Sequence, residues 1–177
     1  MSILKVNQIQ TANGVIMANL NSSGANIGFQ LASSLAPAFK AYRAADQSIS
    51  NSTDTKVQLN TEVFDTNNNF DSTTNYRFTP TVAGYYQFSA ILNLGGTPVT
   101  NAQAHIWKNG VKAAQFVFYE PSGTTQYQIN ASLSDLIYMN GSTDYVELYG
   151  YISAGSGNQF GGGSTQAFLA GYLARSA

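Results

Sequence analysis

Nucleophilic catalysis would need a base, and the sequence offers a single histidine for that role, His105. It lies two residues before Trp107, in a run that ends at an Asn109-Gly110 turn signal. A histidine base works together with a nucleophile and an orienting acid, and no such arrangement surrounds it in the sequence. The chain has no cysteine, which excludes disulfides, thiolate catalysis and cysteine-based metal sites. We therefore interpret His105 as a structural residue.

A second pattern with chemical potential is Asp65-x-Asn67-x-Asn69, which is similar to the start of a calcium loop. Such a loop needs a glycine for its sharp turn and a glutamate at its end. Here Phe70 stands at the glycine position and Tyr76 at the glutamate position. We expect a polar turn and no cofactor, and calcium stays the alternative.

The acidic residues are scattered singly, and none forms an evident pair of the kind that hydrolyses glycosides. The run Gly161-Gly162-Gly163 has neither the spacing nor the lysine of a phosphate-binding loop. We predict a protein that is not an enzyme. A sugar depolymerase, which would need an acidic pair in a cleft, is the enzymatic alternative.

Charge is sparse in this chain: 10% of its 177 residues are charged, and the formal net charge is −1. No basic stripe is present, which argues against nucleic acid as a partner. No apolar run approaches transmembrane length and no secretory signal is evident, so we expect neither membrane insertion nor conventional secretion. A surface of Asn, Ser, Thr, Gln and Gly suits self-association, because few charges must be desolvated at an interface.

Strands would have to position these residues, and residues 65–94 give the clearest strand pattern. A polar turn is followed by a short strand over residues 76–79, by Gly84, and by a run over residues 85–94 that alternates in character. The apolar side of that run consists of Tyr86, Phe88, Ala90, Leu92 and Leu94. We predict a strand with one face in the core and a sharp corner at Gly84.

The chain beyond Pro37 repeats such patterns in about nine or ten short strands with almost no helix. Asn109-Gly110 is the strongest hairpin signal, between strands over residues 102–108 and 111–119. These features predict an antiparallel β-sandwich, for which a jelly roll fits best. The last strand, residues 166–174, is apolar on both faces, so we expect another subunit to cover its second face.

Two stretches rich in Tyr, Asn, Gly and Ser, residues 119–127 and 154–164, read as loops. Tyrosine gives contact area at low entropy cost, and small polar residues adapt to a partner. We predict receptor-facing candidates in these loops, namely Tyr119, Tyr127, Asn158 and Phe160. The alternative is that both loops are plain connections.

Residues 1–36 differ in pattern from residues 37–177. They are apolar in part without a sustained helical or heptad period, and Asn13-Gly14 suggests a small hairpin. Their apolar content is high for a solvated tail. We predict an arm that attaches the domain to a larger assembly through Ile3, Leu4, Val6 and Ile9. An ordered extension without that role is the alternative.

The strand-rich stretch resembles the signature of the C1q/tumour-necrosis-factor-like jelly-roll domain. The family pattern is an aromatic-Asp pair, a further aromatic and F-x(5)-G-x-Y-x-F, which correspond here to Phe64-Asp65, Phe70, Phe78, Gly84, Tyr86 and Phe88. The family's closing strand, F-x-G-[FY]-L, is similar to the run with Gly171, Tyr172 and Leu173. The departures are Leu59 in place of Phe, one extra residue between Phe70 and Phe78, and Ala90 in place of the last aromatic.

This resemblance implies a homotrimer packed about a three-fold axis, with aromatic residues at the interface. The candidates are Tyr86, Phe88, Tyr149, Tyr151, Phe168 and Tyr172. The alternative for each is an ordinary place in the core or on the surface of the sandwich.

The opening residues, S-I-L-K-V-N-Q-I-Q-T-A-N-G, are similar to the N-termini of structural proteins of tailed bacteriophages, notably those that infect cyanobacteria. The resemblance implies a virion protein on the tail or capsid exterior, bound to other virion proteins through residues 1–36. Two roles stay open: a fibre or spike that binds a host cell-surface glycan or protein, and a capsid decoration protein. A cellular C1q-like adhesin that binds a glycan or receptor is the further alternative.

Overall fold

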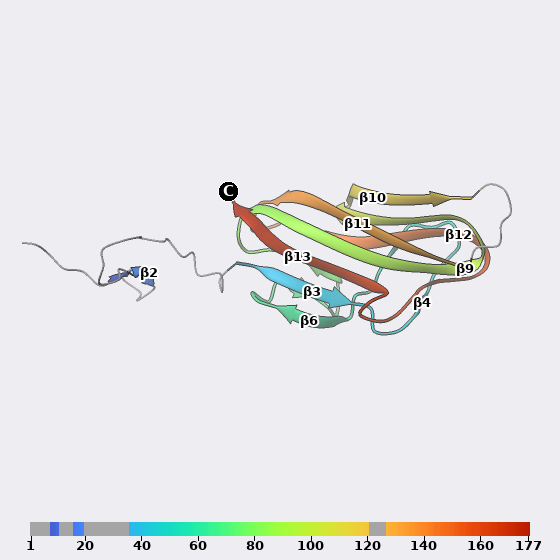
Figure 1. Ribbon diagram of the computed structural model, residues 1–177, viewed down its shortest axis with the longest axis horizontal. Coiled ribbons are helices and arrows are strands. Elements are labelled where there is room, and N and C mark those ends of the chain that lie inside the picture. Colours follow the sequence, from blue (N-terminus) through green and yellow to red (C-terminus); the bar gives the residue numbers. More distant parts are fainter. Residues whose placement is uncertain (1–7, 11–15, 20–35, 121–126) are drawn as a thin grey trace, which may run out of the picture. The chain divides into compact units, whose positions relative to one another are not determined.

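The computed structural model describes residues 8–10, 16–19, 36–120 and 127–177. The chain divides into two compact units, Met1–Ala36 and Pro37–Ala177, and each is described by itself (Figure 1). Among the described residues, none forms a helix of the length and apolarity that a membrane span requires.

The first unit contains two short strands, β1 (Gln8–Gln10) and β2 (Ile16–Asn19), which pair antiparallel. This pairing is that of the small hairpin predicted around Asn13-Gly14, although those two residues lie outside the described ones. Of the predicted attachment residues, Ile9 lies in β1 opposite Ala18. Ile3, Leu4 and Val6 lie outside the described residues.

The second unit is built from strands joined by turns and loops, and none of its described residues is helical. The strands are β3 (Ala38–Tyr42), β4 (Gln47–Ser48), β5 (Thr55–Lys56), β6 (Thr61–Asp65), β7 (Phe70–Asp71), β8 (Arg77–Phe78), β9 (Gly84–Lys108), β10 (Val111–Tyr119), β11 (Gln128–Met139), β12 (Val146–Phe160) and β13 (Ala167–Ser176). Every pairing between them is antiparallel, which confirms the all-β prediction.

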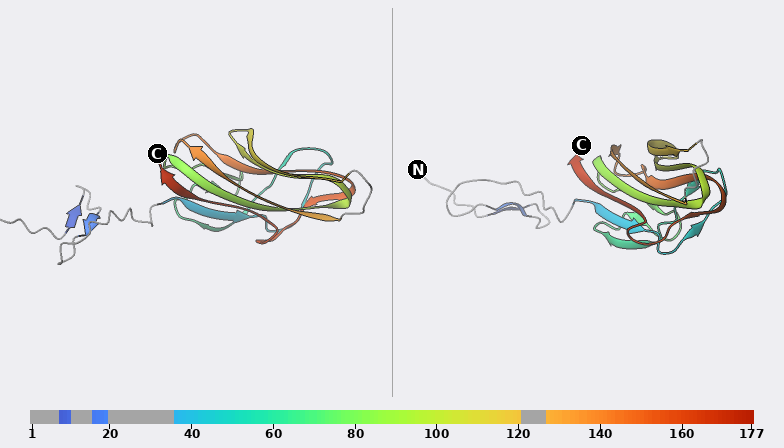
Figure 2. Two further views of the ribbon diagram at one scale, coloured as in Figure 1. Left: turned by 45° about the horizontal axis from the view of Figure 1, so that its top comes forward. Right: turned by 45° about the vertical axis from the view of Figure 1, so that its right-hand side comes forward.

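These strands form the two layers of a jelly-roll sandwich (Figure 2). The first sheet has the order β6-β3-β13-β9-β11 and uses the first half of β9. The second sheet has β10 beside the second half of β9, then β12, and then β4, β5 and β8 along the far edge of β12. β7 pairs with β8 at the margin of this sheet.

β9 connects the two sheets because it continues from one into the other. Its first half begins at Gly84, where an added Cβ would meet the carbonyl oxygen of Arg175, so the corner predicted at this glycine accommodates no side chain. Around its midpoint Gly95 and Gly96 are buried, and a Cβ on Gly96 would lie 2.7 Å from that of Ala154. Side chains of β12 therefore pack closely against the backbone of β9 where it changes sheets, and this contact requires glycine.

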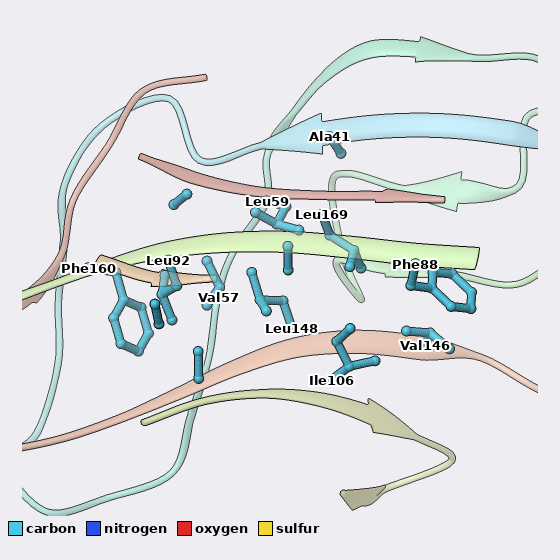
Figure 3. Packing of buried hydrophobic residues seen from close by; sticks show 14 of the residues in the cluster. Ala41, Val57, Leu59, Phe88, Leu92, Ile106, Val146, Leu148, Phe160 and Leu169 are labelled. Carbon is cyan, nitrogen blue, oxygen red and sulfur yellow. The ribbon is translucent and has the colours of Figure 1, made fainter. Parts of the chain in front are cut away.

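The core lies between the sheets and follows the predicted alternation in β9. The side chains of Tyr86, Phe88, Ala90, Leu92 and Leu94 are all buried, as predicted. They meet residues of the second sheet such as Ile106 and Leu148 (Figure 3). Phe39 stacks on Phe78 with ring centroids 4.2 Å apart and on Phe70 at 5.1 Å, so aromatic rings fill one end of this layer.

Some strand boundaries differ from those predicted. β9 is one strand of 25 residues where two separate strands were expected. β12 continues to Phe160, so most of the glycine-rich stretch predicted as a loop is strand. Its end pairs with both β9 and β4, and these pairings hold residues of low strand propensity in extended form.

Candidate association surface

The outer face of the first sheet carries a group of apolar side chains that point away from the core. The register places Tyr172 of β13 beside Gln87 of β9, and Gln87 beside Leu136 of β11. Tyr172 is 54% exposed and Leu136 is 52% exposed. We call this surface the association face and define it by Phe64, Tyr85, Leu136, Tyr138, Phe168 and Tyr172. Clustered apolar exposure of this kind marks an interaction site.

Between these side chains the association face is mostly small and uncharged. Ala170, Ser89 and Ser134 lie in one row across three strands. Lys40, the next residue of that row, holds its ammonium 4.3 Å from the ring centroid of Phe168. A cation over an aromatic ring is stabilised by the electron density of the ring. Another protein surface could therefore cover this face while few charges lose their water.

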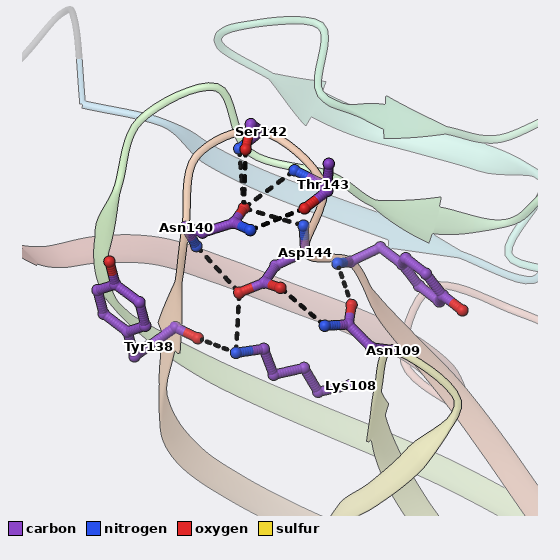
Figure 4. Close-up of polar contacts among 8 residues, drawn as sticks. Lys108, Asn109, Tyr138, Asn140, Ser142, Thr143 and Asp144 are labelled. Carbon is purple, nitrogen blue, oxygen red and sulfur yellow. Dashed lines mark hydrogen bonds and ion pairs between the residues drawn. The ribbon is translucent and has the colours of Figure 1, made fainter.

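A polar network fixes the end of the sheet next to Tyr138 (Figure 4). Lys108 donates to the carbonyl oxygen of Tyr138 at 2.7 Å and lies 2.9 Å from the carboxylate of Asp144. Asn109 donates to the same carboxylate at 2.7 Å, and the backbone N–H of Asn140 donates at 3.0 Å. Burial acts to raise the pKa of Asp144, but these hydrogen bonds and the Lys108 charge hold the pKa below its ordinary value. The turns after β9 and after β11 are thereby joined.

The six predicted interface residues separate into three groups. Phe168 and Tyr172 lie on the association face. The predictions for Tyr86 and Phe88 were wrong, because both side chains are 0% exposed within one protomer and point into its core. A side chain enclosed by its own subunit cannot contact a second subunit.

Tyr149 and Tyr151 lie on the outer face of the second sheet, on the opposite side of the sandwich. The ring of Tyr149 stacks on that of Trp107, with centroids 4.1 Å apart and planes 13° from parallel. Burial raises the pKa of Tyr149, and the negative charge of Glu147 adds to this effect. Both tyrosines are half-buried. Because they lie on the second sheet, a contact between subunits at the association face would not include them.

The predicted receptor-facing residues gather where β9 changes sheets, and one of them is buried. Tyr119 ends β10 opposite Asn101, and the carbonyl oxygen of Tyr127 accepts the N–H of Gly96. Their side chains are 67% and 63% exposed, and Asn158 lies half-buried beside Gly96. The prediction for Phe160 was wrong, because its ring is fully buried in the core, where it faces Gly150.

The Asp65-x-Asn67-x-Asn69 pattern forms a polar turn. One carboxylate oxygen of Asp65 accepts the N–H of Asn67 at 3.2 Å, and the other accepts the N–H of Phe70 at 2.6 Å. The side-chain oxygen of Asn69 lies 3.3 Å from the N–H of Thr81. Backbone donors thus occupy the oxygens that a calcium loop would direct at its ion. In the described ranges, no three His, Cys, Asp or Glu residues group together as metal ligands would.

Sequence reasoning missed four members of the association face, Phe64, Tyr85, Leu136 and Tyr138. The alternation of β9 placed Tyr85 on the side opposite Tyr86, and this was the available signal. Tyr85 and Tyr138 come from neighbouring strands and form an edge-to-face pair with centroids 5.5 Å apart.

No family model matches the sequence, and no curated protein matches it. Solved structures match the fold. Murine APRIL, crystallised at pH 5.0, aligns with a TM-score of 0.60 at 8% identity, covering 78% of this chain and 98% of that chain. The Eiger TNF of S. frugiperda aligns with a TM-score of 0.57 at 7% identity, covering 80% of this chain and 93% of that chain. These likenesses show that the fold is a jelly roll of the tumour-necrosis-factor type.

Proposed function

We propose that the protein is a non-enzymatic, homotrimeric display module whose three association faces pack together. The observation that carries this proposal is the group of six apolar side chains on one sheet face. Large apolar side chains that gather on one face of a soluble protein mark an interaction site. The jelly roll of the tumour-necrosis-factor type commonly forms trimers, which supports three copies as the stoichiometry.

The two ends of the jelly-roll unit suit a display role. The chain enters at Pro37, whose carbonyl oxygen accepts the N–H of Leu173, so β3 starts where β13 finishes. β9 changes sheets at the far end (Figure 1). Tyr119 pairs with Asn101 of β9, and the carbonyl oxygen of Tyr127 accepts the N–H of Gly96. Exposed tyrosines at that end would present amphipathic rings to a glycan or protein.

Within this proposal the module belongs to a bacteriophage virion and is attached to the tail or capsid by residues 1–36. The support is the similarity of the opening sequence to phage structural proteins together with the division of the chain at Ala36. A fibre or spike that binds the host surface is the first role. Capsid decoration is the second, because three-fold symmetry multiplies weak contacts in either setting. A cellular adhesin of the same architecture is the remaining candidate.

The mass of the protein in solution tests the trimer. Light scattering on the purified full chain should give about three times the protomer mass of 18.9 kDa. Leu136→Lys should yield monomers at the same concentration, because a charge would have to be buried at each interface. Val117→Lys is the matched control, since Val117 is 50% exposed on the outer face of the second sheet and should leave the trimer intact. A monomeric wild-type protein would refute the proposal.

Imaging of intact particles with the wild-type protein tests the role. A fibre should place the protein on the tail or as a projection, and a decoration protein should place it at regular capsid positions. Loss of particle attachment on deletion of residues 1–36, with the trimer retained, would support the arm. Release of reducing ends from a polysaccharide incubated with the protein would contradict the non-enzymatic assignment.

A further inference from the structure

The outer face of the second sheet holds a buried histidine under a loop. The β9 alternation points Ala104 and Ile106 into the core and His105 outward, yet His105 is 0% exposed. We call residues 49–54 the cover loop. The N–H groups of Ile49 and Ser52 donate to carbonyl oxygens of β12 at 3.0 and 2.7 Å. From this position the loop extends the side chain of Asp54 towards His105.

The imidazole of His105 is hydrogen-bonded on one side. Its Nε2 lies 3.0 Å from the side-chain oxygen of Gln103, and the amide of Gln103 donates to Asn101 at 3.1 Å. Its Nδ1 lies 3.2 Å from a carboxylate oxygen of Asp54, but the contact is not aligned as a hydrogen bond. The arrangement therefore encloses a neutral ring and offers no formed hydrogen bond for a second ring proton.

The charges around the ring come from four strands or loops. Asp54 of the cover loop is one third exposed, and its other oxygen lies 3.3 Å from the ammonium of Lys112 on β10. On β12, Tyr149 is paired directly with His105 in the register, and Glu147 is already paired with Lys56 of β5 at 2.6 Å. The one carboxylate that faces the ring thus already has a cationic partner.

We propose that His105 is the proton sensor of a latch, so that protonation of its ring releases the cover loop from the second sheet. A protonated ring would be a charge enclosed by protein, next to a carboxylate that Lys112 shares. Opening the loop would bring the ring into water and remove the cost of enclosing that charge. The latch lies on the side of the sandwich opposite the association face, so it operates independently of the trimer.

The direction of the pH effect follows from the surroundings of the ring. Burial lowers the pKa of His105, the charge of Lys112 lowers it further, and Asp54 acts in the opposite sense. With the loop open, the ring would meet water and the pKa would return towards about 6.5. A histidine with a lower pKa in the closed form binds its proton more tightly in the open form. Acid therefore favours opening, about tenfold for each pKa unit between the two forms.

The sequence makes this proposal measurable, because the full chain holds one histidine and one tryptophan. NMR titration of the imidazole reports the pKa of His105 directly. Hydrogen exchange of the Ile49 and Ser52 amides reports the loop, and fluorescence of Trp107 reports the stack with Tyr149. Between pH 7.5 and 5, above the range in which carboxyl groups ordinarily titrate, protection of both amides should fall about tenfold or more.

Variants give effects of opposite sign on the pKa of His105. Lys112→Gln should raise it and reduce the loss of protection, whereas Asp54→Asn should lower it and loosen the loop at both pH values. Asp135→Asn is the control, a carboxylate of the first sheet whose side chain bonds to the neighbouring N–H of Leu136. A pKa at or above about 6.5 would overturn the proposal. Constant protection of Ile49 and Ser52 while His105 titrates would overturn it equally.

Discussion

The ammonium of Lys56 lies 2.6 Å from a carboxylate oxygen of Glu147 and joins β5 to β12 on the outer face of the second sheet. The side chain of Glu147 is 5% exposed, whereas that of Lys56 keeps 30% of its surface. Lys56 also donates to the carbonyl oxygen of Asn75 at 3.2 Å. The buried carboxylate therefore depends on a cation that remains partly in water.

Lys56→Met should lower the free energy of unfolding by about 2 kcal/mol, because Glu147 would stay buried without its cation. The double variant Lys56→Met/Glu147→Leu should recover part of this loss, since no charge is then left in the interior. Urea unfolding of the wild type and of the variants measures both effects. A double variant less stable than Lys56→Met would contradict this explanation.

The hydrogen bonds that the Asp71 carboxylate accepts lead us to expect a loss of stability in acid. Its carboxylate accepts the backbone N–H groups of Thr73, Thr74 and Asn75 at 2.9–3.0 Å. These bonds, those from Thr74 and Thr73 above all, hold the pKa of Asp71 well below its usual range. The folded state thus keeps the carboxylate charged where the unfolded chain, with a pKa of about 3.9, becomes protonated. The stabilisation is complete above that value and is lost as the pH falls further.

Asp71→Asn should therefore cost about 1 kcal/mol at neutral pH and show a weaker pH dependence below about pH 4. The measurement is the urea midpoint of both proteins at pH 7 and pH 3. Equal differences between wild type and variant at the two pH values would show that the turn does not depend on the charge of Asp71.

Phe160 lies in the core and Tyr127 lies at the surface, although the sequence predicted a receptor-facing role for both. Phe160→Ala should destabilise the fold by about 3–5 kcal/mol, because a fully buried ring leaves a cavity next to Leu92 and Gly150. Tyr127→Ala should leave stability within about 0.5 kcal/mol, since its side chain is exposed. Thermal unfolding of the two variants tests this. A stable Phe160→Ala protein would restore the loop interpretation.

The sequence predicted the fold where a local rule was sufficient. Alternation along residues 85–94 identified a strand and its buried face, because side chains change sides at every residue. It failed for residues 154–160, where glycine and serine suggest a loop. Their extended form comes from pairing with β9 and β4, strands far away in sequence. Local propensity contains no information about such partners.

The candidate surfaces were predicted less completely, for a related reason. Residue type marks tyrosine as suited to an interface, but the second sheet decides which face of β9 is covered, so Tyr86 is buried and Tyr85 exposed. The contact between Asp54 and His105 spans 51 positions, and its chemistry appears only when the cover loop crosses the sheet. Alternation and residue type predicted the strand over residues 85–94, whereas the packing of the two sheets determined which side chains are covered and which are exposed.

The phenol of Tyr86 is enclosed in the core, so we expect the stability of the fold to depend on pH in alkali. Its hydroxyl donates to the carbonyl oxygen of Val82 at 2.8 Å, and burial raises the pKa of Tyr86 to about 12. In the unfolded chain a tyrosine ionises near pH 10, so the unfolded state loses its proton first. The contribution of this residue to stability is therefore complete below about pH 10 and is lost as the pH rises towards 12.

Tyr86→Phe should cost about 1 kcal/mol at pH 8, because the carbonyl oxygen of Val82 loses its donor. From pH 9 to pH 11 the wild type should lose more stability than this variant, since the variant has no phenol to ionise on unfolding. Urea unfolding at the three pH values measures both effects. Tyr127→Phe is the matched control, because the Tyr127 side chain is exposed and lies outside the core, and it should leave the slope unchanged. If the free energy of unfolding falls equally with pH in Tyr86→Phe and in the wild type, the Tyr86 hydroxyl is reached by water at high pH before the chain unfolds, and the prediction is wrong.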